Sequence, residues 1–134
     1  MLDEILKFTN ITFYIQLIYG IVFTMLFWIP TISLPMFGVI YTDEAGALSQ
    51  MIGAAVAALT VGTILALRKR EWSEVQIKMM VEIVWQVVVM TVIIINSPLL
   101  GIYAITNVLI VVPEFVFTLL SVLQQEEIIK PLLK

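Results

Sequence analysis

The longest uncharged stretch of this chain runs from Phe8 to Thr42. A helix needs roughly 20 apolar residues to cross the hydrocarbon of a bilayer, so this stretch exceeds one crossing. Hydrophobic residues make up 61% of the 134 residues, which leaves too little polar surface to cover a soluble globule. The sequence therefore predicts an all-α integral membrane protein with a single domain over residues 1–134.

Four membrane helices, packed as a bundle, are expected. Pro30 and Pro35 divide the first uncharged stretch, so the segment after Pro30 is too short to span the membrane. We expect that segment, up to Tyr41, to lie along the outer surface or to fold over the mouth of the bundle. Thr42 can cap the next helix, whose first turn carries two carboxylates. The predicted helices cover about 10–29, 43–67, 74–95 and 98–123, and the last should continue into a cytoplasmic extension to about residue 130.

All seven Lys and Arg residues fall on one side of the membrane if the chain crosses it four times. They lie near the N-terminus, in and after the second connection, and in the C-terminal tail: Lys7, Arg68, Lys69, Arg70, Lys78, Lys130 and Lys134. Basic residues concentrate in cytoplasmic loops of membrane proteins. We therefore expect a multi-pass protein of the cell membrane with both termini in the cytoplasm.

Histidine and cysteine are both missing from the sequence. Their absence removes most metal and haem ligation, thiol nucleophiles and Ser-His-Asp triads, so we expect no metal and no cofactor. The sequence also has no basic patch with interleaved aromatic residues, which argues against nucleic acid as a partner.

Two glutamates, Glu82 and Glu114, are the most informative polar residues. Counted from the turn near Ser97, Glu82 lies about 21 Å back along the third helix and Glu114 about 24 Å forward along the fourth. A carboxylate inside the bilayer costs on the order of 2.5–3.5 kcal/mol, so both should face the bundle interior. Burial and mutual repulsion favour a single proton shared between them.

Other polar residues share these helix faces at helical spacing. The full predicted ligand-binding set is Glu82, Gln86, Asn107, Glu114, Gln16 and Tyr19, and we expect it to form a pocket that opens toward the cytoplasm. Two simpler interpretations remain open. Glu82 can form an i,i+4 ion pair with Lys78, and the amide side chains can serve only as hydrogen bonds between helices.

Small residues recur every four positions along the second helix, in the tracks Ser49-Gly53-Ala57 and Ala54-Ala58-Gly62-Ala66. Such tracks let helices approach closely, either inside one bundle or across a homodimer. We favour packing inside the bundle. Membrane lipids are the expected partners, and a homodimer or a larger membrane complex is the alternative.

The first half of the chain resembles small four-span prokaryotic proteins that are grouped as domains of unknown function, of the DUF4345-like kind. The resemblance rests on Ile29-Pro30 to Phe37-Gly38, on Thr42 and Ala45, and on Gly53-Ala54 with the small residues that follow up to Arg68. It implies the four-span fold and no activity.

Three functions fit these features. The first is a binding or accessory protein that holds a lipid or another apolar molecule, or that docks onto a larger membrane complex. The second is a small proton-coupled transporter or channel in which the carboxylates bind a proton or cation. The third is an acid–base isomerase or cyclase that uses Glu82 and Glu114 on a lipid substrate.

Overall fold

The computed structural model describes residues 3–133 and contains six helices with no strand among those residues. The helices are α1 (Lys7–Trp28), α2 (Pro30–Met36), α3 (Asp43–Leu67), α4 (Trp72–Ile95), α5 (Ser97–Leu100) and α6 (Ile102–Gln125). The predicted all-α class is confirmed.

Four of these helices, α1, α3, α4 and α6, are long and apolar enough to cross a membrane. Large apolar side chains cover their outer faces, for example Ile18, Met25, Ile77 and Leu109, each more than half exposed. An outer surface of this kind needs lipid to cover it. The predicted bundle of four membrane-length helices is therefore confirmed, while the side of the membrane on which the termini lie stays a prediction.

The observed helix limits differ from the predicted ones at four places. Helix α1 begins at Lys7, ahead of the predicted residue 10, and α4 begins at Trp72. The predicted fourth helix is interrupted at Gly101, whose φ of 57° and ψ of −130° separate α5 from α6. The expected extension to residue 130 is not helical, because α6 ends at Gln125 and the chain turns at Glu127, where φ is also 57°.

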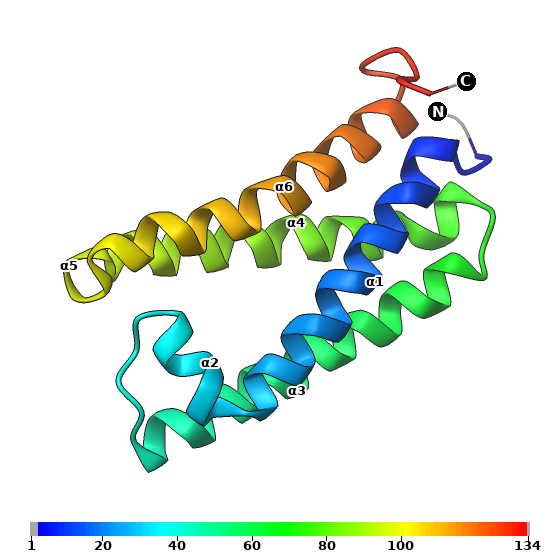
Figure 1. Cartoon of the computed structure of the whole chain (residues 1–134). Helices are drawn as coiled ribbons and strands as arrows, with labels where there is room; N and C mark the ends of the chain where they lie inside the picture. The colour runs from blue at the N-terminus through cyan, green and yellow to red at the C-terminus, as the bar shows by residue number, and fades with distance from the viewer. Residues whose placement is uncertain (1–2, 134) are drawn as a thin grey trace.

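The four long helices form two hairpin-like pairs that diverge from one another. Helix α1 packs along α3, and α4 packs along α6. Figure 1 shows the pairs close together where both termini lie and far apart at the end that carries α2 and α5. We call these the packed end and the wide end.

The packed end contains the main apolar core, which consists of Phe13, Ala66, Trp72, Val75, Met79 and Val122. Trp72 is 0% exposed, and its Nε1 donates a hydrogen bond of 2.6 Å to Glu126 Oε1. The N-terminal segment closes this end: Ile5 N donates to Arg70 O, and Leu6 N donates to Gln125 Oε1. Both chain ends and the α3–α4 connection therefore meet there (Figure 1).

The basic residues gather at this same end of the bundle, with one exception. Lys7, Lys130 and the Arg68–Arg70 connection are exposed there, whereas Lys78 turns inward. Lys134, the last of the seven, lies outside the described residues. The basic residues thus mark one end of the fold, as the four-span topology requires.

The apolar segment after α1 folds back at the wide end. Helix α2 packs against α1 and α3, and Asn107 Nδ2 on α6 donates a 3.0 Å hydrogen bond to Phe37 O. Gly38 has φ +81°, and a Cβ there would lie 2.6 Å from the Tyr103 ring. This loop therefore ties the α1–α3 pair to the start of α6.

Small residues bring α1 and α3 into close contact. A Cβ at Gly20 would lie 2.1 Å from Thr60 Oγ1, and one at Gly53 would lie 2.6 Å from Trp28 Cδ1. Ser49 Oγ also donates to Phe27 O at 3.0 Å. The track through Ser49 and Gly53 thus packs inside the chain, while Ala54 and Ala58 are exposed. A homodimer stays a prediction.

Candidate functional site

A cavity of about 460 Å³ lies between the diverging helix pairs. All four long helices contribute to its walls, which are mostly apolar. Its polar lining residues are Gln16, Tyr19, Thr60, Thr63, Glu82, Gln86, Asn107 and Glu114. Most of these lie at the deep end, next to the packed core, whereas Leu34, Phe37 and Leu100 line the wide end.

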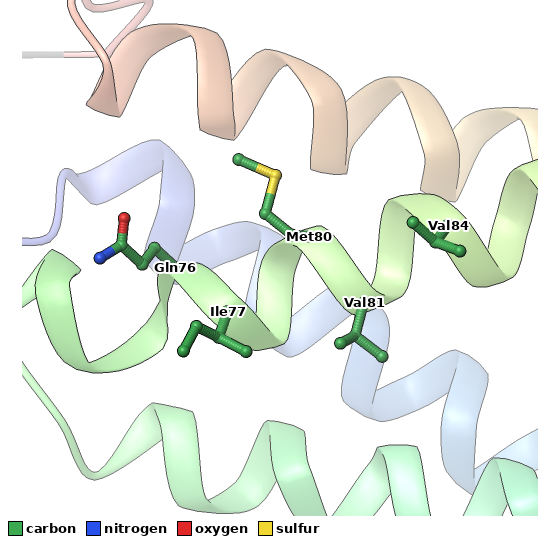
Figure 2. Close-up of a pocket in the computed structure, with 5 residues that line it drawn as sticks. All are labelled: Gln76, Ile77, Met80, Val81 and Val84. Carbon is green, nitrogen blue, oxygen red and sulfur yellow. The ribbon is translucent and has the colours of Figure 1, made fainter.

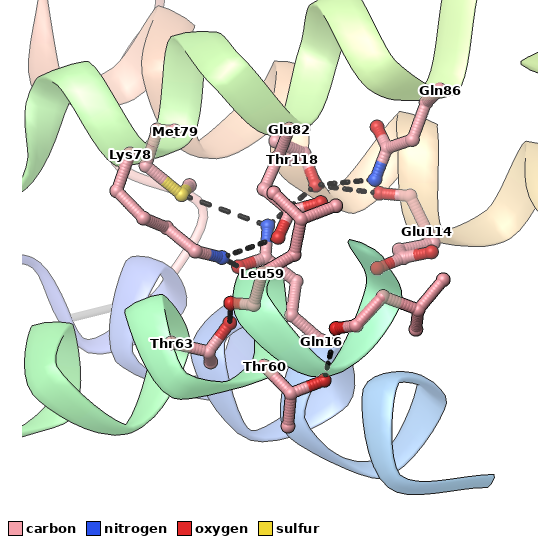
Figure 3. Close-up of polar contacts among 11 residues, drawn as sticks. Gln16, Leu59, Thr60, Thr63, Lys78, Met79, Glu82, Gln86, Glu114 and Thr118 are labelled. Carbon is pink, nitrogen blue, oxygen red and sulfur yellow. Dashed lines mark hydrogen bonds and ion pairs between the residues drawn. The ribbon is translucent and has the colours of Figure 1, made fainter. Parts of the chain in front are cut away.

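An ion pair forms part of the polar floor. Lys78 Nζ lies 2.8 Å from Glu82 Oε1, and Lys78 also donates a hydrogen bond to Gln16 Oε1 (Figure 3). The Lys78 ammonium lies 5.6 Å from the centre of the Phe13 ring, within range of a cation–π interaction. Glu82 is 5% exposed, so a positive partner is needed to offset its burial.

Thr118 connects the floor across three helices. Its Oγ1 donates to Glu114 O at 2.8 Å and accepts from Gln16 Nε2 at 2.9 Å and from Gln86 Nε2 at 3.5 Å. The hydroxyl therefore uses its single donor and both acceptor positions. Because the Thr118 hydroxyl donates to Glu114 O, it can only accept from the two glutamines. Each glutamine therefore turns its amide nitrogen, and not its oxygen, toward Thr118.

Two acceptors on this floor are not fully used. Gln86 is 1% exposed, and within residues 3–133 its Oε1 has no hydrogen-bond partner. Glu114 forms no ion pair among the same residues: its carboxylate interacts with the Gln86 amide, and its nearest charged neighbours are Glu82 and Lys78, which are paired with each other. A buried acceptor without a donor costs roughly 1–3 kcal/mol, so the floor is suited to receive donors.

Aromatic rings form one wall between this floor and the wide end. Tyr19, Phe23 and Phe27 follow one another at four-residue spacing on α1, with ring centroids 5.8 and 6.1 Å apart. Phe37, from the loop after α2, lies 5.5 Å from Phe27 and 6.1 Å from Phe23. All four rings line the cavity.

The six residues predicted from the sequence all line this one cavity, at two levels. Gln16, Glu82, Gln86 and Glu114 gather at the deep end (Figure 3), and Tyr19 lies close enough to interact electrostatically with Glu114. Asn107 lies two helical turns from Glu114 and binds the loop at Phe37 instead. Its amide therefore holds the wide end together.

The two expectations that the pocket opens toward the cytoplasm and that both termini lie in the cytoplasm cannot both hold, and some residues of the pocket were missed. The cavity extends from the floor toward the wide end and not toward the end with the termini, because Phe13, Trp72 and Met79 fill the latter. Lys78 and the Phe23–Phe27–Phe37 wall were not predicted as site residues. The i,i+4 spacing of Lys78 and Glu82, and the four-residue spacing of the rings, were the available signals.

A second, shallow hollow lies on the outside of α4. Figure 2 shows its lining residues, Gln76, Ile77, Met80, Val81 and Val84, all from that one helix. Four of the five are exposed apolar side chains. A hollow of this composition on a membrane-length helix fits contact with lipid chains, and Gln76 is its one polar lining residue.

Comparison with protein-family models, with curated proteins and with solved structures finds no match for this chain. The likeness to four-span proteins of the DUF4345-like kind therefore stays a prediction, and function has to be argued from the cavity.

Proposed function

We propose that this protein binds one apolar or amphipathic molecule, such as a membrane lipid, in the cavity between its helix pairs. The observation that carries the proposal is the composition of the cavity: aromatic and aliphatic walls above a small cluster of polar side chains. Binding pockets for small molecules typically measure 300–1,000 Å³ and combine apolar walls with a few oriented polar groups. A volume of about 460 Å³ falls in that range.

The shape of the bundle supports the same proposal. Lipid chains are as apolar as the side chains, so the hydrophobic effect does not pull the two helix pairs together, and an empty apolar space between them forfeits dispersion contacts. A molecule between the pairs would supply those contacts at the wide end. We also propose that the packed end faces the cytoplasm of a cell, since the exposed basic residues lie there.

Native mass spectrometry of the protein, released from its membrane or from nanodiscs, tests this proposal. We expect an adduct of constant mass on the wild-type chain. Val89→Trp, which fills the cavity wall, should remove the adduct. Val84→Trp, one and a half turns earlier on the exposed face of the same helix, should retain it. Equal adducts on both variants, or none on the wild type, would refute a binding role for the cavity.

A proton-coupled transporter is the second candidate, because three ionisable groups, Lys78, Glu82 and Glu114, meet inside the membrane-spanning region. Buried ionisable groups of this kind often mark proton or ion pathways. Proton flux into liposomes distinguishes the two candidates. A transporter should lose its flux in Glu114→Gln, whereas a binding protein should show no flux in either form.

A further inference from the structure

The floor of the cavity is rich in acceptors and poor in free donors. Gln86 Oε1 lacks a partner, and Glu114 has a carboxylate that no cation neutralises within the described chain. Most donors there are already engaged, Lys78 with Glu82 and Gln16, and the amides of Gln16 and Gln86 with Thr118, so that the Tyr19 hydroxyl is the donor left near Glu114. A ligand that brings its own N–H or O–H groups would therefore complete this floor, above all at Gln86 Oε1.

The charge of the floor further restricts which head groups can bind there. Lys78 and Glu82 offset each other, so an ionised Glu114 leaves one negative charge in the cavity. An anionic head group would face both carboxylates, while the ammonium of Lys78 is already occupied. An opposite charge close to Glu114 is favourable in a medium of low dielectric constant.

The wall next to the floor also suits a cation. The rings of Tyr19, Phe23 and Trp85 line the same cavity as Glu114 and Gln86, and Tyr19 lies close enough to interact with Glu114. The face of an aromatic ring attracts an ammonium ion within about 6 Å of its centre. A divalent metal fits less well, because no group of three or more metal-binding side chains occurs among residues 3–133.

We propose that the occupant is an amphipathic amine: a molecule with an apolar body and one protonated amino group. The ammonium binds Glu114 and Gln86 Oε1 at the floor, and the apolar body extends along the aromatic wall toward the wide end. A primary ammonium carries three donors, enough to serve both acceptors. This inference rests on the proposed binding function and names the chemical class of its ligand.

Three probes with one common chain test the proposal: dodecylammonium, dodecanol and dodecanoate. Their binding is measured by titration calorimetry on the full protein in phosphatidylcholine nanodiscs, with empty nanodiscs subtracted to remove partitioning into lipid. We expect dodecylammonium to bind about tenfold or more tightly than dodecanol, since of the two head groups only the ammonium can form an ion pair with Glu114. Dodecanoate should bind most weakly.

Variants at the floor show whether Glu114 causes this preference. Glu114→Gln should reduce the affinity for dodecylammonium to that for dodecanol, and Glu114→Asp should keep the order of the probes. Gln86→Leu should weaken dodecylammonium more than dodecanol. Glu44→Gln removes an exposed acid at the start of α3 and should change nothing.

The outcomes separate the two proposals. Equal binding of dodecylammonium and dodecanol would overturn the amine proposal and leave apolar binding standing, as would equal losses for all probes in Glu114→Gln. Binding of none of the probes above empty nanodiscs, together with no adduct in native mass spectrometry, would overturn the binding function itself. If Glu114→Gln fails to fold, Gln86→Leu decides the preference.

Discussion

The packed end and the wide end of the bundle are built from the same four helices, yet they differ in how the helices meet. At the packed end, Thr12 Oγ1 pairs with Ser121 Oγ at 2.7 Å and Thr9 Oγ1 donates to Gln125 Oε1 at 3.1 Å, both between α1 and α6. Farther along α1 the residues that line the cavity are Phe23 and Phe27, whose rings contact Phe37 in the loop after α2.

This difference shows where a membrane bundle gains its cohesion. Between apolar helices in lipid, close packing and interhelical hydrogen bonds drive association, because lipid chains are as apolar as the side chains themselves. Small hydroxyl side chains and glutamines supply both at the packed end. At the wide end large rings face the gap, and the hydrogen bond from Asn107 Nδ2 to Phe37 O joins α6 to a loop and not to another long helix, so the pairs separate and leave room for another molecule.

The largest expected effect concerns the side of the membrane on which each end of the bundle lies. The sequence has no native cysteine, so single cysteines can be labelled cleanly. Thr42→Cys and Ser97→Cys at the wide end should react with an impermeant reagent from outside intact cells. Lys69→Cys at the packed end should react only after the membrane is opened. Labelling of Lys69→Cys in intact cells would contradict the proposed orientation.

Stability should depend strongly on the core of the packed end. Trp72→Ala removes a fully buried ring and should lower the free energy of unfolding by about 3–5 kcal/mol. Trp28→Ala, at the wide end, removes a ring that is 58% exposed and should cost much less. Unfolding of each variant by a denaturing detergent measures the difference. Equal losses would show that the two ends contribute alike to stability.

A smaller effect is expected at the break between α5 and α6. Gly101 has a backbone conformation that L side chains rarely adopt, although nothing lies within 4 Å of a Cβ there. Gly101→Ala should therefore lower stability by about 1–3 kcal/mol through backbone strain alone. Gly62→Ala, inside α3 with ordinary contact to Lys78, should raise stability by roughly 0.5–1 kcal/mol. An unchanged free energy of unfolding in Gly101→Ala would show that the backbone between α5 and α6 can adopt another conformation without glycine.

The smallest change in stability is expected at the cavity floor. Glu114→Gln removes a carboxylate that has no ion-pair partner in the described chain, so the free energy of unfolding should change by less than about 1 kcal/mol or rise. As a control, Glu82→Gln leaves Lys78 buried without its carboxylate and should cost about 3–5 kcal/mol. A large loss in Glu114→Gln would mean that its charge holds the helices together.

The sequence predicted the helices well where local chemistry determines them. Helix α3 has the predicted limits because Thr42 Oγ1 accepts a hydrogen bond from Ala45 N and the basic connection follows Leu67. The break at Gly101 was missed because a single glycine does not reveal its φ. Helix α4 begins at Trp72, two residues ahead of the predicted residue 74, and Ser73 Oγ in its first turn donates to Asp3 Oδ1.

The candidate site was predictable in composition but not in shape. Counting residues from the turn near Ser97 placed Glu82 and Glu114 at one depth, and both line the cavity. Helical periodicity tells which residues share a face, but not how far apart two faces lie. The cavity opens toward the wide end because Phe13, Trp72 and Met79 fill the space between the helices at the packed end. Only the assembled bundle shows which end is filled.

The divergence of the helix pairs is the central claim, and distances between spin labels test it directly. One label pair, Leu48→Cys with Ile94→Cys, joins α3 and α4 near the wide end, and the matched pair, Leu65→Cys with Ile77→Cys, joins the same helices near the packed end; all four positions are exposed. Double electron–electron resonance in nanodiscs should give a clearly longer distance between the spin labels at positions 48 and 94 than between those at positions 65 and 77. Equal distances would mean parallel helices without a cavity and would contradict the account.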